Sequence, residues 1–229
     1  METAYLEQDM LSVNCDLLAM LGSRRKRLGL LGGTFDPIHY GHLDIAAKAR
    51  DGFALHRMVL LPAKTPPHKP STEHEEPEHR LEMARLAVKD KATMEVWDIE
   101  LRRSGTSYTV DTLMEISLAT SDEYDLFYVC GSDTFLDLLS WQDIGRVLQL
   151  CTMLVVYRPG SGSEPVQRMK AHLEEVYSAQ IFLTQSSGPD ISSTEIRERL
   201  ALGLSVSHLI PRSVEDYIRI NGLYERVCS

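Results

Sequence analysis

Two histidines stand three positions apart in the stretch from Leu28 to Leu43, which reads LGLLGGTFDPIHYGHL. On a helix, His39 and His42 would lie on one face, because residues at this spacing are neighbours. Two imidazoles on one face can donate hydrogen bonds to phosphate oxygens and can stabilise charge that develops in a transition state. The same spacing also fits a metal site or a solvated helix face, and the spacing alone does not decide among these.

The residues before the histidines indicate an anion site. Leu28 to Leu31 form an apolar run typical of a buried parallel strand, and Gly32 and Gly33 follow it directly. We expect the two glycines to form a tight turn whose backbone can approach a ligand, with Thr34 beside them. A helix predicted from Leu43 to Arg50 would add the positive end of its dipole. This is neither a GxxxxGK[ST] loop nor a GxGxxG fingerprint.

A second helix start of this kind occurs far along the chain, in the stretch ISSTEIR from Ile191 to Arg197. Ser192 and Glu195 have the spacing of a capping box, which predicts a helix N-terminus whatever the function. Arg197 follows about one turn into that helix. Hydroxyls, a helix N-terminus and an arginine fork together favour polyphosphate binding. The alternative is a stable helix cap with a surface arginine.

Two further segments carry candidate ligand groups. The loop from Pro62 to Pro70 has four prolines and contains Lys64 and Lys69, so it is stiff and is either a phosphate contact or a rigid solvent loop. Asp133 follows the apolar strand predicted from Asp125 to Cys130, at the strand end where open α/β sheets bind ligands. It serves either as a ligand contact or as a helix N-cap.

These motifs together resemble a known family. GGTFDPIHYGH is similar to the signature of the HxGH-motif nucleotidyltransferase superfamily, and most of all to that of the bacterial nicotinate mononucleotide adenylyltransferases. ISSTEIR resembles the second signature of the superfamily. The resemblance extends from Leu28 to Tyr224 and implies a Rossmann-like nucleotidyltransferase fold. It also implies transfer of AMP from ATP to nicotinate mononucleotide, with Mg²⁺ carried on the ATP phosphates and no dedicated protein metal site.

The resemblance also assigns roles to individual positions. The residues implied in catalysis are His39, His42 and Arg197. Those implied in ATP or phosphate binding are Gly32, Gly33, Thr34, Lys64, Lys69, Asp133, Arg158, Ser192, Ser193 and Thr194. Those implied in holding the pyridine ring are Tyr108, Thr109 and Trp141. Two other readings remain: a sister enzyme acting on nicotinamide mononucleotide, phosphopantetheine or a cytidylyl donor, and a nucleotide sensor without catalysis.

The remaining pattern alternates strands and helices, which predicts an α/β fold with a doubly wound parallel sheet. Further strands are expected at Arg57–Leu61, Met94–Leu101, Thr152–Tyr157 and Gln180–Thr184. Further helices are expected at Arg80–Val88, Val110–Ala119, Pro165–Tyr177 and within Leu209–Tyr224. Arg80 and Arg85 are interpreted as ordinary surface charges.

Length and composition limit the class of protein. The 229 residues suit one domain, predicted at 28–229, preceded by an extension at 1–27 that we expect to be partly disordered. A net charge of −9 argues against a general nucleic-acid-binding surface. Four widely spaced cysteines favour free thiols in a cytoplasmic protein. No targeting segment or membrane span is predicted, and the sequence leaves monomer and homodimer open.

Overall fold

The computed structural model describes residues 24–65, 75–120, 123–157, 163–185 and 188–225. Within these ranges the chain forms one six-stranded sheet in the order β3-β2-β1-β4-β5-β6, and all strand pairs are parallel. The strands are β1 (Lys26–Gly33), β2 (Arg57–Pro62), β3 (Met94–Val96), β4 (Tyr124–Gly131), β5 (Thr152–Tyr157) and β6 (Ile181–Gln185). The strand order reverses between β1 and β4, which is where such sheets bind ligands. The predicted doubly wound α/β fold is confirmed.

Alternate residues of the central strands bury their side chains on opposite faces of the sheet. In β2, Met58 and Leu60 belong to one core cluster, and Val59 and Leu61 belong to the other. Because both faces are covered, the strands are apolar throughout, and these four residues are at most 1% exposed. The continuous apolar runs that predicted the strands therefore reflect burial on two sides.

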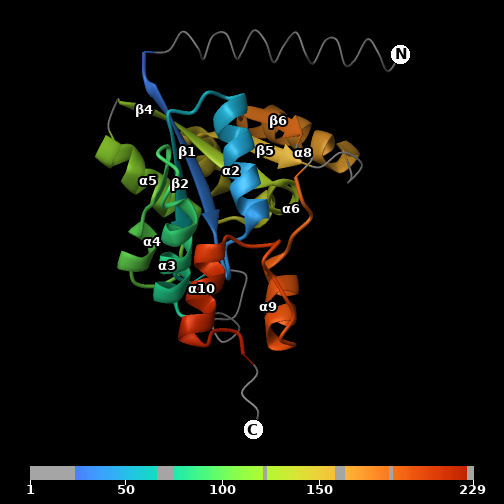
Figure 1. Ribbon diagram of the computed structural model, residues 1–229. Coiled ribbons are helices and arrows are strands. Elements are labelled where there is room, and N and C mark those ends of the chain that lie inside the picture. Colours follow the sequence, from blue (N-terminus) through green and yellow to red (C-terminus); the bar gives the residue numbers. More distant parts are fainter. Residues whose placement is uncertain (1–23, 66–74, 121–122, 158–162, 186–187, 226–229) are drawn as a thin grey trace.

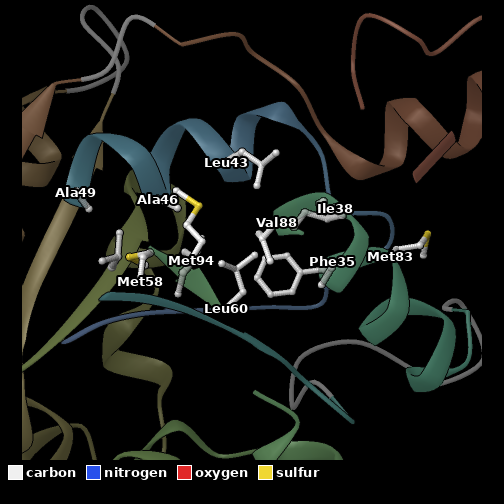
Figure 2. Close-up of a cluster of buried hydrophobic side chains, with 14 of the residues drawn as sticks. Phe35, Ile38, Leu43, Ala46, Ala49, Met58, Leu60, Met83, Val88 and Met94 are labelled. Atoms are coloured by element: carbon white, nitrogen blue, oxygen red, sulfur yellow. The ribbon is translucent and has the colours of Figure 1, made fainter. Parts of the chain in front are cut away.

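Helices cover both faces (Figure 1). One core cluster includes side chains from α2 (Tyr40–Gly52), α3 (Pro77–Val88), α9 (Ser193–Ala201) and α10 (Arg212–Asn221). The other includes side chains from α5 (Thr109–Thr120), α7 (Ile144–Leu150) and α8 (Ser163–Tyr177). Figure 2 shows Leu43 and Ala46 of α2 directed toward Met58 and Leu60, with Phe35 packed beneath the start of the helix. The core thus holds the start of α2 against the sheet. Within the described ranges, no helix combines the length and apolarity needed to cross a bilayer.

Several predicted boundaries were wrong. The strand expected at Met94–Leu101 ends at Val96, and Ile99–Arg102 is a short helix, α4. Arg102 pairs with Asp98 at 2.6 Å, four residues away, an interaction that suits a helical turn and not a strand. The strand β1 begins at Lys26, inside the predicted extension, and α2 begins at Tyr40 instead of Leu43. The helix start considered at Asp133 is present as α6 (Ser132–Leu136), but Asp133 lies in its first turn and Gly131 is the N-cap. Two short elements were not predicted: the 3₁₀ turn η2 (Leu138–Ser140) and α7.

Candidate active site

A cavity of about 1090 Å³ lies where β1 and β4 end, at the reversal of the strand order. Its volume is at the upper end for small-molecule sites and suits a nucleotide together with a second substrate. The cavity gathers thirteen of the sixteen predicted site residues from positions throughout the chain. They are Gly32, Gly33, Thr34, His39, His42, Tyr108, Thr109, Asp133, Trp141, Ser192, Ser193, Thr194 and Arg197.

The two histidines form the N-terminal cap of α2. His39 is the N-cap residue, and its Nδ1 accepts a hydrogen bond from the His42 backbone N–H at 3.3 Å. Nδ1 of His42 accepts from the His39 backbone N–H in return, also at 3.3 Å. The two rings stack with their centroids 3.7 Å apart. The pair is therefore a capping box built from imidazoles, with both rings at the cavity wall.

Gly41 is required by this arrangement. A Cβ at that position would lie 2.9 Å from Nδ1 of His39, closer than real Cβ contacts allow. Glycine therefore lets the His39 ring fold back over the first turn of α2. The glycine of the His-x-Gly-His motif is therefore required for steric reasons, and the two histidines supply its chemical groups.

The glycine pair of the sequence was expected in a turn, but Gly32 and Gly33 are the last two residues of β1. A Cβ on Gly32 would lie 2.3 Å from the Tyr128 hydroxyl, and one on Gly33 would lie 2.9 Å from the Phe35 ring. The chain turns after them, where Phe35 has a positive φ of 51° and the Asp36–Pro37 peptide is cis. The absence of a Cβ at these glycines leaves room for the Tyr128 and Phe35 side chains. The chain turns only after the glycine pair, at Phe35 and the cis peptide between Asp36 and Pro37.

The N-terminus of α9 meets this turn. Ser192 is the predicted N-cap, and its Oγ accepts a hydrogen bond from the Glu195 backbone N–H at 3.1 Å. Ser193 donates its hydroxyl to the carbonyl of Pro37 at 3.0 Å, across 156 positions of sequence. The third predicted hydroxyl, that of Thr194, accepts from NH2 of Arg197 at 3.3 Å, so all three have protein partners and the helix start offers mainly its backbone N–H groups to a ligand.

Arg197 joins the same two segments. Its NH1 group donates to the carbonyl of Asp36 at 2.8 Å, and its NH2 group donates to Oγ1 of Thr194 at 3.3 Å. The guanidinium lines the cavity and its side chain is 27% exposed. Two helix N-termini and one arginine thus face the same space, an arrangement that favours a highly charged anion such as a polyphosphate.

Arg80 was interpreted as a surface charge, and this was wrong. The residue is 1% exposed and donates to the carbonyls of Glu75, Thr34, Ala63 and Lys64 at 2.7 to 3.1 Å. Its guanidinium therefore connects the turn after β1 with the loop after β2. Burial lowers the pKa of Arg80, and the nearby Asp36 carboxylate opposes that shift.

A sequence signal for the burial of Arg80 existed. Arg80 shares a helical stripe with Ala84 and Ala87, which are also buried, at positions i, i+4 and i+7. The exposed Arg85 lies off this stripe and pairs with Asp98 at 3.7 Å, so for that residue the surface interpretation is confirmed.

Lys64 is the one predicted phosphate ligand among the described residues that does not line the cavity. Lys64 donates its ammonium group to the carbonyl of Arg103 at 2.9 Å, and its backbone N–H donates to Ser107 Oγ at 3.1 Å. In this arrangement it connects two loops. Lys69 and Arg158 lie outside the described residues.

The three residues predicted to hold the pyridine ring line the cavity, with Tyr108 and Thr109 at the start of α5. Trp141 follows η2, and its ring meets the Tyr128 ring edge to face at 5.5 Å between centroids. Tyr128 is buried, and burial raises the pKa of its hydroxyl. Trp141 is thereby held at the wall, in a position to stack on a flat ring.

Glu100 is a cavity residue that the sequence reasoning did not select. It is 7% exposed, and Thr112 donates its hydroxyl to the Glu100 carboxylate at 2.9 Å. Burial raises the pKa of Glu100, while hydrogen bonds from Thr112 and Ser107 oppose the shift. Arg103 also contacts Thr112, so this network connects α4 to the first turn of α5. No sequence pattern marked it, because Glu100 falls in the segment that was predicted as a strand.

The cavity wall also carries carboxylates, the side chains that a hard metal ion prefers. Among the described residues, no group of three or more His, Cys, Asp or Glu side chains is placed to hold a metal ion. Asp44, Asp133 and Asp190 are separate carboxylates on the wall. This donor set fits an ion that is held mainly by substrate phosphates and water, as Mg²⁺ usually is.

Comparison with known families agrees with this geometry. The family model described as cytidylyltransferase-like matches residues 30–199, which include both helix starts at the cavity. A parallel sheet with a His-x-Gly-His cap and a Ser-Ser-Thr helix start at its ligand edge defines a nucleotidyltransferase.

Relatives narrow the family further. A protein of Geotalea daltonii named probable nicotinate-nucleotide adenylyltransferase is 40% identical over 213 residues, which cover 86% of this chain and 98% of the relative. A protein of the same name from Thermoanaerobacter sp. is 36% identical over 203 residues, covering 89% and 96%. The chain belongs to this nicotinate-nucleotide adenylyltransferase family.

A solved structure shares the fold. The nicotinic acid mononucleotide adenylyltransferase of Plasmodium falciparum, complexed with NaAD, superposes with a TM-score of 0.73 at 20% identity. The match covers 87% of this chain and 98% of that one. The likeness confirms the predicted nucleotidyltransferase fold.

Proposed function

We propose that this enzyme transfers AMP from ATP to nicotinate mononucleotide, giving nicotinate adenine dinucleotide and pyrophosphate in NAD biosynthesis. The names of the relatives support this activity. The observation that carries the proposal is the convergence of the N-termini of α2 and α9, the His39–His42 pair and Arg197 on one cavity that aromatic side chains also line.

The chemistry follows from that arrangement. An oxygen of the mononucleotide 5′-phosphate attacks the α-phosphorus of ATP, a new P–O bond forms, and the bond to the β-phosphate oxygen breaks to release pyrophosphate. No covalent enzyme intermediate is needed, so the protein contributes positioning and charge stabilisation. His39 and His42 would donate to the α-phosphate oxygens, and Arg197 with the start of α9 would hold the leaving pyrophosphate.

The backbone of Gly32, Gly33 and Thr34 would contact the phosphates, and Asp133 would face the nucleotide. For Lys69 and Arg158, a role in phosphate binding is proposed from the family resemblance alone. Mg²⁺ would be bound by the ATP phosphates and would neutralise part of their charge. A cytoplasmic location belongs to the same proposal, and the buried free thiols of Cys130 and Cys151 are compatible with a reducing compartment.

The acceptor would be selected at the start of α5. Its first N–H groups and positive dipole end favour a carboxylate, whereas a carboxamide must turn its own NH₂ toward donors. A carboxylate forms charge-assisted hydrogen bonds worth about 1.5–3 kcal/mol, whereas a carboxamide NH₂ turned toward the same donors forms none and leaves groups unpaired. The expected preference for nicotinate over nicotinamide mononucleotide is therefore about ten- to hundredfold in kcat/KM.

The test is pyrophosphate release with ATP and Mg²⁺ in the presence of nicotinate mononucleotide, nicotinamide mononucleotide or phosphopantetheine, with a parallel series in which CTP replaces ATP. The proposal requires the nicotinate acceptor and ATP to give the highest kcat/KM. Equal rates with the two pyridine acceptors would indicate a dual-specificity enzyme. Binding of nucleotide without turnover of any acceptor would indicate a sensor.

A further inference from the structure

Tyr224 lies near the end of the described chain, yet its side chain reaches the turn after β1. Its hydroxyl donates a hydrogen bond to Oδ1 of Asp36 at 2.6 Å, across 188 positions of sequence. Its backbone N–H donates to Oε1 of Glu75 at 3.3 Å. Tyr224 has a positive φ of 63°, which a bulky residue adopts only where its surroundings hold it there. The contact to Asp36 is thus maintained against a backbone cost.

Asp36 is a buried carboxylate with donors on two sides. It is 1% exposed, and its Oδ1 accepts from Tyr224 and, at 3.4 Å, from the Glu75 backbone N–H. Its Oδ2 lies 3.7 Å from NH1 of Arg197, beyond hydrogen-bonding distance. That NH1 group donates to the Asp36 carbonyl instead. The carboxylate therefore accepts a short hydrogen bond from Tyr224, whereas its contact with Arg197 is a long ion pair.

We propose that Tyr224 is a positioning residue for phosphate binding, because its hydroxyl holds the Asp36 carboxylate away from Arg197 and so leaves the guanidinium directed into the cavity. This inference rests on the proposed function, in which Arg197 holds the leaving pyrophosphate. A buried carboxylate needs hydrogen-bond donors. When the tyrosine hydroxyl is removed, the Arg197 guanidinium, 3.7 Å from Oδ2, can supply them through a bidentate pair, whereas the nearby Arg80 is engaged with four backbone carbonyls. A guanidinium paired in that way has less charge and fewer N–H groups to offer a phosphate.

The variant Tyr224→Phe removes the hydroxyl and keeps the ring. The matched control is Tyr217→Phe, because Tyr217 on α10 also uses its hydroxyl in one hydrogen bond, to Nδ1 of His79 at 2.9 Å, and it does not line the cavity. Binding of inorganic pyrophosphate and of a non-hydrolysable ATP analogue is measured by calorimetry in wild type and both variants. Melting temperature is recorded for each protein, so that a loss of fold is separated from a loss of affinity.

Tyr224→Phe is expected to weaken pyrophosphate binding roughly tenfold and to raise KM for ATP by a similar factor, while KM for nicotinate mononucleotide stays within about twofold. Tyr217→Phe is expected to leave the pyrophosphate affinity and both KM values at the wild-type level. In an Arg197→Lys background, Tyr224→Phe has little further effect on pyrophosphate, because the bidentate pair cannot form with lysine.

Unchanged pyrophosphate affinity in a folded Tyr224→Phe protein overturns the inference and leaves the proposed function standing. The same holds if the loss is equally large in the Arg197→Lys background, or if ATP and the mononucleotide weaken together. If Tyr224→Phe does not fold, the second comparison is between the Arg197→Lys protein and the Arg197→Lys/Tyr224→Trp protein. A tenfold lower pyrophosphate affinity in the double variant contradicts the inference. A wild-type protein that binds neither pyrophosphate nor the ATP analogue overturns the proposed function and this inference together.

Discussion

Nδ1 of His39 and Nδ1 of His42 each accept a hydrogen bond from the backbone N–H of the other residue. An imidazole nitrogen that accepts a hydrogen bond carries no hydrogen, so each neutral ring has its hydrogen on Nε2. The capping box therefore fixes the tautomer of both rings. Both Nε2 atoms are N–H donors in the neutral state, which is the role a negatively charged transition state requires.

His42→Ala is expected to lower kcat by about two to three orders of magnitude, because removal of one transition-state donor typically has that effect. The fold should be retained with a stability loss of about 1 kcal/mol, the usual cost of a lost helix cap. Steady-state pyrophosphate release and thermal unfolding check the two parts. His208→Ala, at an exposed position outside the cavity lining, is the control. A His42→Ala enzyme with wild-type kcat would remove this residue from the mechanism.

Arg80→Lys should reduce both stability and activity, although the charge is conserved. Lysine cannot reproduce four hydrogen bonds to backbone carbonyls from a planar fork. We expect a loss of ~2–4 kcal/mol in the free energy of unfolding, since buried carbonyls are left without donors. We also expect a lower kcat/KM, because the turn after β1 and the loop after β2 are no longer connected.

The control for that substitution is Arg85→Lys on the same helix. Arg85 is half exposed and forms only surface ion pairs, so its replacement should change stability by less than about 1 kcal/mol. Urea denaturation of the two variants gives the comparison. Equal stability losses would contradict the structural role assigned to Arg80.

The buried carboxyl group of Glu100 should make the protein less stable as the pH rises above the acidic range. Its pKa is raised in the folded protein, chiefly by burial, so the folded state favours the protonated carboxyl. The stabilising contribution is complete below the unfolded pKa, about 4.3, and is lost as pH rises through the folded pKa. Glutamine does not ionise, so the Glu100→Gln variant should not lose this stability as the pH rises. The free energy of unfolding of the variant minus that of wild type should therefore increase from pH 4 to pH 7. Denaturation curves of both proteins at the two pH values check the sign, and a constant difference between them would refute it.

Trp141→Ala should weaken both pyridine acceptors by a similar factor, because a stacked indole does not distinguish a carboxylate from an amide. Aromatic stacking on a base contributes roughly 1–3 kcal/mol, so KM should rise about ten- to hundredfold. Trp141→Phe keeps a ring at the wall and should recover most of the affinity. The measurement is kcat/KM for nicotinate and nicotinamide mononucleotide with each variant. A changed ratio would place acceptor selection at Trp141 and not at the start of α5.

Patterns local in sequence predicted most of this architecture. The continuous apolar strands and the Ser192 cap were predicted correctly because hydrophobic pattern and capping chemistry act over a few residues. The roles of Arg80 and Glu100 were missed because each depends on partners that only the tertiary structure supplies. The burial of a charged side chain cannot be predicted until the carbonyls around it are known, and the four acceptors of Arg80 come from two connections, the one after β1 and the one between β2 and α3.

The glycines near the site show the same limit. Gly32 was expected in a tight turn but lies in β1, where its small size accommodates Tyr128, almost a hundred positions away. Gly41 was noticed only as the spacer between two histidines, whereas its requirement comes from the His39 ring. In both cases the residue type was visible in the sequence, and the atom that imposes it was not.

The bond between Ser193 and Pro37 has a consequence for folding. It joins segments 156 residues apart, and β4, β5 and β6 lie between them in the sequence. Contacts of such long sequence separation form late, because closing the intervening chain is entropically expensive. A nascent or truncated chain that ends before α9 contains all six strands but lacks one of the two helix N-termini that face the cavity. Activity should return after the bulk of the secondary structure when the denatured protein refolds, which gives the cell a period in which the polypeptide is largely folded and still inert.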